Sequence, residues 1–320
     1  MITEKYHASQ FRSCLTVIIP ALNAMPYLPA ALASLKAQTF RNFEVILWDN
    51  GSMDGTVEEA SRWIPERLPG RVVSDQPLPL HLCLARMVKE AETDFIVRMD
   101  ADDICLPERM SVQLQALQGD KNLAVVGSRY REIDASGAFL PDPAPFPADY
   151  VGLLGAFLTC NALLHPSVMF RRSAVLAAGN YNPCPPPCED YDLWMRVAKT
   201  HQLANLPQVL LHYRVHDRGI ISSARQKGVL EEPNRACIQR HCQELFHLSP
   251  HLYARLRERR VFVAALALLP AAQAISRRAQ VPLSRVLGSP SFLFSARCLT
   301  RSSDLLSRLL WGVCQRSLAP

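Results

Sequence analysis

Three carboxylates stand within four residues, at Asp100, Asp102 and Asp103, directly after the apolar run Phe95–Met99. An apolar run of this length predicts a buried strand, so the carboxylates follow a strand end. Like charges this close repel one another, and a hard divalent cation such as Mg²⁺ or Mn²⁺ prefers carboxylate oxygens as ligands. The pattern therefore predicts a cation site. The alternative is a solvated turn whose last aspartate caps a helix beginning at Leu106.

A second polar turn, at Asp49 and Asn50, follows the apolar run Phe43–Trp48. Both side chains can accept a hydrogen bond, so they suit contact with a nucleobase imide or a ribose hydroxyl. The alternative is a turn in which these side chains bond to their own backbone.

A third acidic pair, Glu189 and Asp190, precedes apolar residues at helical spacing (Leu193, Trp194 and Val197). Acidic residues at the first turn of a helix are stabilised by its macrodipole, which is one sufficient explanation for the pair. The functional interpretation is a general base, because a partly desolvated carboxylate near a substrate hydroxyl can take its proton.

Histidines occur in two further apolar stretches. In the predicted strand Leu206–His216, alternation puts Arg214 and His216 on one face. By itself this placement is equally typical of a solvent-facing histidine at a sheet edge. For His165 we expect a packed or backbone-bonded histidine.

Strand and helix patterns alternate through the first half of the chain, which predicts an α/β fold with a doubly wound, mostly parallel sheet. In such sheets ligands bind beyond the carboxyl ends of the strands. We therefore expect the strand ends at Ala21–Asn23, Asp49–Asn50 and Asp100–Asp103 to share one edge. The predicted strands are Leu15–Pro20, Phe43–Trp48, Arg71–Val73, Phe95–Met99 and Leu123–Gly127, and the predicted helices are Tyr27–Gln38, Thr56–Ile64, His81–Ala91 and Pro107–Gln118.

From roughly Cys14 to Ser223 the sequence resembles the family-2 glycosyltransferases of bacterial cell-surface polysaccharide synthesis, whose fold is called GT-A. The resemblance lies in the stretches Val17–Asn23, Trp48–Gly55, Arg98–Arg109, Thr159–Arg172 and Cys188–Val197. It implies transfer of a sugar from a nucleotide-sugar donor to a hydroxyl of a saccharide acceptor, free or lipid-linked, usually with inversion at the anomeric carbon.

The same resemblance implies a role for each matched residue. Asp190 would be the catalytic base, with Glu189 orienting it or binding acceptor hydroxyls. His216 would complete the coordination of Mn²⁺ or Mg²⁺ held by Asp100 and Asp102. The donor site would consist of Pro20, Asn23, Asp49, Asn50, Arg86, Asp100, Ala101 and Asp102.

Three positions depart from the family pattern. Asn50 stands where relatives often have a second aspartate, and it keeps an acceptor oxygen but loses the charge. Ala85-Arg86-Met87 replaces the usual Asn-x-Gly, so Arg86 would contact phosphate in its place. Leu22 stands where some relatives stack an aromatic ring on the base.

The charge of the chain is concentrated at its C-terminal end. The net charge is +6, and residues 241–320 carry 11 Arg and no Lys against Glu244, Glu258 and Asp304. This predicts a catalytic domain over 1–222 and a basic, mainly helical extension over 223–320. Val261–Ile275 is too short for a spanning helix. The extension either lies on an anionic membrane surface or caps the catalytic domain with a solvated arginine face. Nucleic acid is not expected, because no aromatic residues alternate with the arginines.

The N-terminal residues lack the apolar core of a signal peptide, and the ten cysteines are scattered. We therefore expect a cytoplasmic protein with reduced thiols. If the extension binds lipid, the protein would be peripheral to the inner face of the membrane. Two other functions remain open at this point. One is a sugar-nucleotide pyrophosphorylase, which would want a Gly-rich basic loop that Pro20–Met25 does not supply. The other is a non-catalytic nucleotide-sugar-binding subunit, which would not need the Glu189–Asp190 pair.

Overall fold

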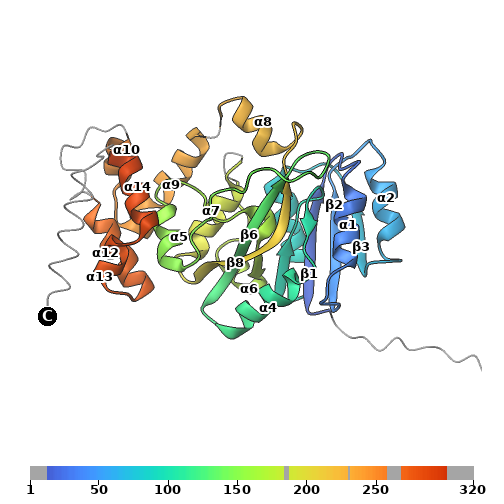
Figure 1. The fold of residues 1–320 in the computed structure, drawn as a ribbon, viewed down its shortest axis with the longest axis horizontal. Coiled ribbons are helices and arrows are strands. Elements are labelled where there is room, and N and C mark those ends of the chain that lie inside the picture. The colour runs from blue at the N-terminus through green and yellow to red at the C-terminus, as the bar shows by residue number, and fades with distance from the viewer. Residues whose placement is uncertain (1–12, 184–186, 230, 258–267, 301–320) are drawn as a thin grey trace, which may run out of the picture.

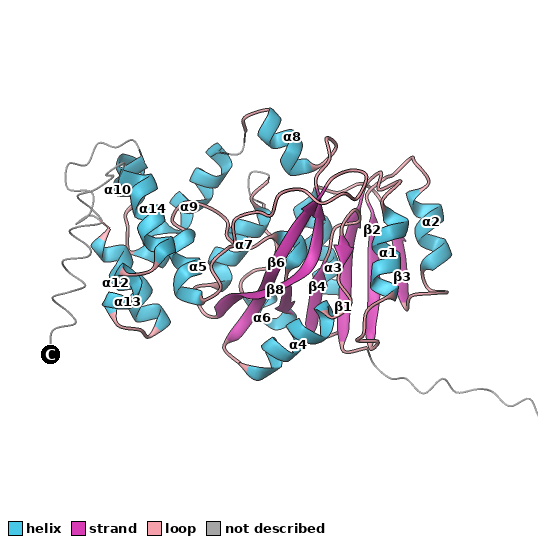
Figure 2. Cartoon of the chain, viewed as in Figure 1, coloured by secondary structure: helices cyan, strands magenta, loops and turns pink. Residues whose placement is uncertain are grey.

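The computed structural model describes residues 13–183, 187–229, 231–257 and 268–300. Its centre is one eight-stranded sheet with the order β3-β2-β1-β4-β7-β6-β8-β5 (Figures 1 and 2). The N-terminal strands lie at one end of the molecule and the C-terminal helices gather at the other (Figure 1).

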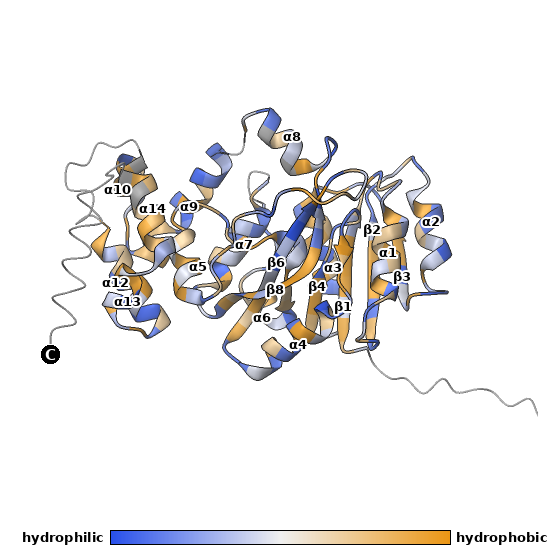
Figure 3. Cartoon of the chain, viewed as in Figure 1, coloured by the Kyte–Doolittle hydropathy of each residue, from blue (hydrophilic) through white to orange (hydrophobic). Residues whose placement is uncertain are grey.

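Four strands form the parallel half of the sheet, as the alternating pattern predicts. Their residues are largely buried and apolar, the composition expected of strands covered on both faces (Figure 3). Helices cover both faces, with α1, α2 and α4 (Arg109–Gly119) on one side and α3, α6 (Arg172–Ala177) and α7 (Glu189–Val197) on the other. The strands are β1 (Leu15–Ala21), β2 (Phe43–Asp49), β3 (Gly70–Ser74) and β4 (Phe95–Arg98), and the helices between them are α1 (Leu28–Lys36), α2 (Thr56–Trp63) and α3 (Leu80–Glu90).

The other half of the sheet is mixed. Strand β7 (Met169–Arg171) runs antiparallel to both β4 and β6 (Leu123–Ile133), and β8 (Gln202–Arg214) runs parallel to β6. The edge strand β5 (Ile104–Cys105) pairs antiparallel with β8. The fold class is therefore α/β as predicted, with the purely parallel arrangement confined to β1–β4.

The helix after the carboxylates begins later than Leu106. Residues Ile104–Cys105 pair with β8, so α4 (Arg109–Gly119) starts only after the chain has left the sheet. Asp103 accepts a hydrogen bond from the backbone N–H of Arg214 at 2.8 Å and does not cap α4. The expectation that the last aspartate caps a helix is wrong, because long-range strand pairing takes that carboxylate.

The C-terminal helices pack on the sheet domain through α5 (Tyr150–Ala156) and α7 (Glu189–Val197). Their apolar side chains belong to the same core as those of α7. The remaining helical elements are η1 (His165–Ser167), α6 (Arg172–Ala177), α8 (Ile220–Gln226), α9 (Glu231–Phe246), α10 (Pro250–Arg257), α12 (Leu269–Ala279), α13 (Leu283–Leu287) and α14 (Pro290–Thr300).

Among the described residues, no helix combines the length and the apolar character needed to cross a bilayer. Residues 261–267 of the apolar stretch Val261–Ile275, and the Cys184 end of the Cys184–Cys188 pair, lie outside the described residues.

Candidate functional site

The carboxyl ends of β1, β2 and β4 meet at one edge of the sheet, as expected from their parallel pairing. Ala21 is in register with Asp49, and the N–H of Asn50 donates to the Ala21 carbonyl at 2.8 Å. Asn23, in the left-handed conformation at φ 49°, accepts from the N–H of Met53 at 2.9 Å and donates its own N–H to Ser52 at 2.8 Å. The two turns therefore form one surface, with Pro20 at its border in β1.

Asp49 is almost fully buried under the turn that follows it. Its carboxylate accepts hydrogen bonds from the N–H groups of Gly51 at 3.1 Å and Ser52 at 3.2 Å. The hydroxyl of Ser74, at the end of β3, lies 3.5 Å from the same oxygen. These are the self-capping bonds of the alternative interpretation, and contact of Asp49 with a base stays a prediction.

Both polar atoms of the Asn50 side-chain amide form hydrogen bonds with the backbone of Leu78. Its Oδ1 accepts from the Leu78 N–H at 2.7 Å, and its Nδ2 donates to the Leu78 carbonyl at 2.8 Å. A carboxylate could make the first bond but not the second. The asparagine therefore fixes residues 75–79 beside the turn.

The three aspartates after β4 converge at the same edge. One carboxylate oxygen from each of Asp100, Asp102 and Asp103 lies within 4.8 Å of the others. Asp103 is fully buried, and burial, together with the charges of Asp102 and Asp100, raises its pKa well above the usual value. Its second oxygen, Oδ2, has no hydrogen-bond partner among the described residues.

His216 joins this cluster from beyond the end of β8. Its Nε2 lies 2.8 Å from Asp102 Oδ2, and its ring lies 4.9 Å from that of Tyr27. Arg214 contacts the same turn, because its Nε donates a hydrogen bond to the Asp102 carbonyl at 2.8 Å. The guanidinium of Arg214 also stacks 4.7 Å from the Tyr27 ring.

This donor set fits a divalent cation. A buried, unpartnered carboxylate oxygen is costly, and the close carboxylates of Asp100, Asp102 and Asp103 repel one another. Hard oxygen ligands with one imidazole suit Mn²⁺ or Mg²⁺. Asp103 is not among the predicted ligands, but its carboxylate lies in the same cluster as those of Asp100 and Asp102.

Asp190 lies in the first turn of α7 and is buried. It accepts hydrogen bonds from Asn161 Nδ2 and from the N–H of Tyr191, both at 2.7 Å. Burial and the neighbouring charge of Glu189 raise the pKa of Asp190 to about 7. Burial also raises the pKa of Glu189. A carboxyl group that titrates near neutrality is suited to exchange protons with a substrate hydroxyl.

Arg98 connects the two acidic groups electrostatically. It is buried at the end of β4, with Nη1 2.6 Å from Asp100 Oδ2. Its charge acts to lower the pKa values of both Glu189 and Asp190, while the charge of Asp100 acts to raise that of Glu189. The buried positive charge of Arg98 therefore acts on carboxylates from two distant parts of the chain.

Sequence reasoning did not assign roles to Arg98 and Asn161. Arg98 directly precedes the carboxylates in a matched stretch, so a buried cation before a cluster of acids was the available signal. Asn161 lies in the stretch Thr159–Arg172, but no pattern marks it as a partner of Asp190.

The structure places two other residues considered in the sequence, His165 and Arg86. His165 is buried and its Nε2 lies 2.8 Å from Tyr181 Oη, as expected for a packed histidine. Arg86 pairs with Asp75 at 3.1 Å and lies 5.6 Å from the Trp48 ring, so any contact with phosphate stays a prediction. Ala101 is buried between the aspartates.

Comparisons with known proteins agree with this geometry. The family model described as Glycosyl transferase family 2 matches residues 16–176. The chain is 29% identical over 220 residues to the O-antigen biosynthesis glycosyltransferase WbnJ of Escherichia coli, covering 66% of this chain and 83% of WbnJ. It is 30% identical over 190 residues to the amylovoran biosynthesis glycosyltransferase AmsE of Erwinia amylovora, covering 58% and 70%.

Solved structures show the same fold at low identity. The mannosyltransferase PcManGT from Pyrobaculum calidifontis, in complex with GDP-Man and Mn²⁺, superposes with a TM-score of 0.54 at 19% identity, covering 97% of this chain and 88% of that one. S. aureus TarS in complex with UDP-GlcNAc gives a TM-score of 0.54 at 17% identity, covering 95% and 92%.

Proposed function

Because the chain belongs to glycosyl transferase family 2 and is a glycosyltransferase, we propose that it moves a sugar from a nucleotide-sugar donor to a hydroxyl of a saccharide acceptor, inverting the anomeric carbon. The observation that carries the proposal is the environment of Asp190. Its carboxyl group is buried, held at 2.7 Å by Asn161, and has a pKa of about 7.

In the proposed reaction Asp190 acts as the general base. It takes the proton of the acceptor hydroxyl while that oxygen attacks the anomeric carbon from the face opposite the nucleotide. The bond from the anomeric carbon to the diphosphate oxygen breaks as the new bond forms, and its electron pair leaves with the nucleoside diphosphate. Asn161 fixes the carboxylate, and Glu189 beside it binds or orients acceptor hydroxyls.

The donor would lie along the edge formed by β1, β2 and β4. The base would contact the turn at Asp49 and Asn50, and the diphosphate would lie over Asp100, Ala101 and Asp102. Asp100, Asp102 and His216 would hold Mn²⁺ or Mg²⁺, with Asp103 beside them. Such an ion neutralises negative charge on a departing nucleoside diphosphate.

We place the reaction in the synthesis of a bacterial surface polysaccharide, as the names of WbnJ and AmsE indicate for those relatives. The acceptor would be a saccharide, lipid-linked if the basic C-terminal region contacts the inner face of the membrane. Family membership favours this function over a pyrophosphorylase.

A nucleotide-sugar screen tests the donor half of the proposal. We expect one nucleotide sugar to raise the melting temperature of the full chain, and the rise to require Mn²⁺ or Mg²⁺. A melting temperature that no nucleotide sugar changes, with or without either ion, would contradict the proposed donor site.

The variant Asp190→Asn separates an enzyme from a non-catalytic binder. With the stabilising donor and a panel of saccharide acceptors, release of nucleoside diphosphate should fall by about 10²–10⁴-fold, because a positioned base contributes that much. Donor-dependent stabilisation should remain. The surface variant Asp142→Asn is the matched control and should keep full activity. Equal rates for Asp190→Asn and the parent chain would favour the binder.

A further inference from the structure

The imidazole of His216 lacks the hydrogen bond that usually orients a metal-binding histidine. Its Nε2 lies 2.8 Å from Asp102 Oδ2, while its Nδ1 is buried and has no hydrogen-bond partner among the described residues. A histidine that binds a metal ordinarily donates its other ring N–H to a carboxylate, a carbonyl or a water molecule, and this bond fixes the orientation of the ring. In this chain the orientation of the His216 ring therefore depends on packing.

The ring of Tyr27 packs against both residues that reach the carboxylates from β8 and the segment after it. Its centre lies 4.9 Å from that of the His216 imidazole, with 37° between the ring planes, and 4.7 Å from the guanidinium carbon of Arg214. Arg214 in turn donates from Nε to the Asp102 carbonyl and from its backbone N–H to Asp103 Oδ1, both at 2.8 Å. One aromatic ring thus contacts the two side chains that bond to the turn after β4.

Tyr27 directly precedes helix α1, next to the turn proposed for the nucleotide base. Its backbone N–H donates to the Ala24 carbonyl at 2.9 Å, and the N–H of Met25 donates to Asp54 Oδ2 at 2.9 Å. The Met25 carbonyl accepts a hydrogen bond from Nη2 of Arg218, in the segment after β8, at 3.3 Å. The chain just before α1 is therefore fixed to the turn after β2 and contacts the segment after β8.

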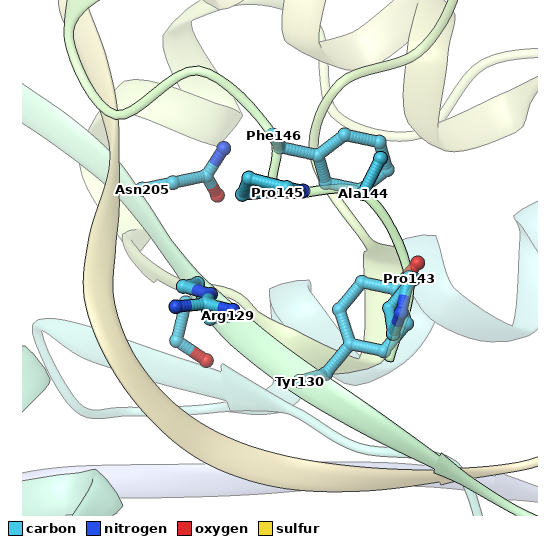
Figure 4. Close-up of a pocket in the computed structure, with 8 residues that line it drawn as sticks. Arg129, Tyr130, Pro143, Ala144, Pro145, Phe146 and Asn205 are labelled. Atoms are coloured by element: carbon cyan, nitrogen blue, oxygen red, sulfur yellow. The ribbon is translucent and has the colours of Figure 1, made fainter. Parts of the chain in front are cut away.

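The opposite face of β8 has different surroundings. Successive residues of a strand point to opposite sides, and the ring of Tyr213 lies 6.0 Å from that of Tyr130. Tyr130 lines a hollow beside β6 that has room for about one water molecule (Figure 4). A hollow of that size cannot hold a sugar or a phosphate. We therefore place ligand binding at this end of β8 on the face toward Tyr27.

We infer that Tyr27 is a positioning residue of the cation site, whose ring orients the imidazole of His216 toward Asp102 in place of a hydrogen bond at Nδ1. The same ring supports the turn at Asp102 through Arg214. The inference rests on the proposed function, since it takes Asp100, Asp102 and His216 as the ligands of Mn²⁺ or Mg²⁺. Tyr27 acts through His216 and does not itself bind the ion.

Electron paramagnetic resonance of Mn²⁺ added to the full chain tests this role, with the metal alone as the probe. The contacts of Tyr27 with His216 and Arg214 are made by its ring, so Tyr27→Phe should bind Mn²⁺ as tightly as the parent chain. Tyr27→Leu should raise the dissociation constant about 10–100-fold, the usual effect of losing a group that orients a metal ligand.

Phe139→Leu is the matched control. The ring of Phe139 contacts that of His212, a histidine of β8 outside the carboxylate cluster, with the ring centres 5.0 Å apart. The substitution removes an aromatic contact with a histidine of the same strand, and Mn²⁺ affinity should equal that of the parent chain.

Electron spin-echo modulation of the bound Mn²⁺ gives a second readout, because a coordinated imidazole nitrogen modulates the echo. We expect this nitrogen signal in the parent chain and in Tyr27→Phe, and a reduced signal or none in Tyr27→Leu. A general loss of stability would lower the melting temperature without removing the nitrogen signal from protein that is still folded. All variants are therefore measured well below their melting temperatures.

Three outcomes would overturn the inference alone: unchanged Mn²⁺ affinity in Tyr27→Leu, weaker affinity with an unchanged nitrogen signal, or an equal loss in Tyr27→Phe. In the last case the hydroxyl, not the ring, would be responsible. Asp102→Asn separates these results from a failure of the proposed function. If the parent chain and Asp102→Asn bind Mn²⁺ equally, or neither binds it, the proposed cation site is wrong and the inference is wrong with it.

Discussion

Desolvation has a larger effect on the pKa of Asp190 than its position at the start of a helix, and its proposed role as a base depends on that pKa. A helix N-terminus and two hydrogen bonds favour the charged form of an acid. Burial and the charge of Glu189 outweigh them, and the pKa rises to about 7. The buried Arg98 opposes this rise. The balance leaves a carboxyl group whose pKa lies close to neutral pH.

This balance predicts how the rate depends on pH. A base must be deprotonated, so kcat/KM should increase about tenfold per pH unit below pH 7 and level off above it. Initial rates between pH 5.5 and 9, with donor and acceptor below saturation, measure the profile. A rate that is flat from pH 5.5 to 8 would contradict a base with this pKa, provided that melting temperatures show the fold intact over that range.

The hydrogen bonds of Asn50 explain why this chain has asparagine where relatives often have aspartate. Both of its amide atoms bond to the backbone of Leu78, and a carboxylate at this position would face the Leu78 carbonyl without a proton to donate. We therefore expect Asn50→Asp, although it restores the common family residue, to lower the free energy of unfolding by about 1–3 kcal/mol.

Urea denaturation of the parent chain and of Asn50→Asp measures this loss. Asp75→Asn, in the same loop but about half exposed, is the control and should stay within about 0.5 kcal/mol of the parent. If Asn50→Asp is as stable as the parent and binds donor more tightly, the two hydrogen bonds of the Asn50 amide to Leu78 are not needed for stability. The charge of the family residue would then contribute more to donor binding than the amide does.

Single residues differ in how much the sequence reveals of them. Family membership is confirmed, and the acidic positions of the site could be predicted because strand ends and helix starts mark them. Asp103 contacts Arg214 and Asn161 contacts Asp190, so the roles of Asp103 and Asn161 depend on contacts between segments far apart in the chain. Local patterns carry no information on such contacts.

At the level of elements, strands β1–β4 and their helices follow the predicted pattern. Helices α1 and α2 each lead to a neighbouring parallel strand, and α3 carries the chain across the sheet to β4 beside β1. The α/β fold and its GT-A likeness are confirmed. Strand β5 was missed, since a two-residue strand at Ile104–Cys105 has no periodicity and exists only through pairing with β8.

A buried carboxylate joins helix α7 to helix α9. Asp192, two residues beyond Asp190, accepts from His241 Nε2 at 2.8 Å, from Arg240 at 3.0 Å and from Arg196 at 2.8 Å. Burial alone would raise the pKa of Asp192, but the hydrogen bond from His241 and the charge of Arg196 hold it at about 2. Because the folded pKa is depressed, this stabilisation is present above about pH 4 and is lost as the pH falls toward 2.

We expect the two partners of Asp192 on α9 to contribute unequally to the free energy of unfolding. His241 is buried, so His241→Ala should lower the free energy of unfolding at pH 7 by about 2 kcal/mol. The side chain of Arg240 is 45% exposed, and Arg240→Ala should cost no more than about 1 kcal/mol. Denaturant unfolding at constant ionic strength compares them. Equal losses would mean that the carboxylate is solvated and does not fasten α9 to α7.

At the scale of the whole molecule, residues beyond 222 share the core of the catalytic part. Leu245 and Phe246 of α9 are fully buried in the same cluster as Trp194 of α7. Tyr253 of α10 donates to the Leu158 carbonyl at 3.2 Å. Packing of this kind favours a helical cap as the role of the described helices. The boundary at 222 and a membrane contact stay predictions.

Helices α5 and α14 approach each other closely at Gly155, and this contact provides the last prediction. A Cβ atom on Gly155 would come within 2.8 Å of the backbone nitrogen and 3.0 Å of the Cα of Phe292. Backbone cannot move aside as a side-chain end can, so Gly155→Ala must push α14 away from α5. We expect a loss of about 1–3 kcal/mol in the free energy of unfolding.

Gly119→Ala, at the end of α4, is the matched control, because nothing lies within 4 Å of its added Cβ and alanine favours a helix. Its stability should equal or exceed that of the parent. If Gly155→Ala also retains the stability of the parent, the C-terminal helices are loosely attached and contribute little to the core. If it loses stability together with catalytic rate, the helices after residue 222 support the catalytic part through this contact, and the molecule folds as one unit.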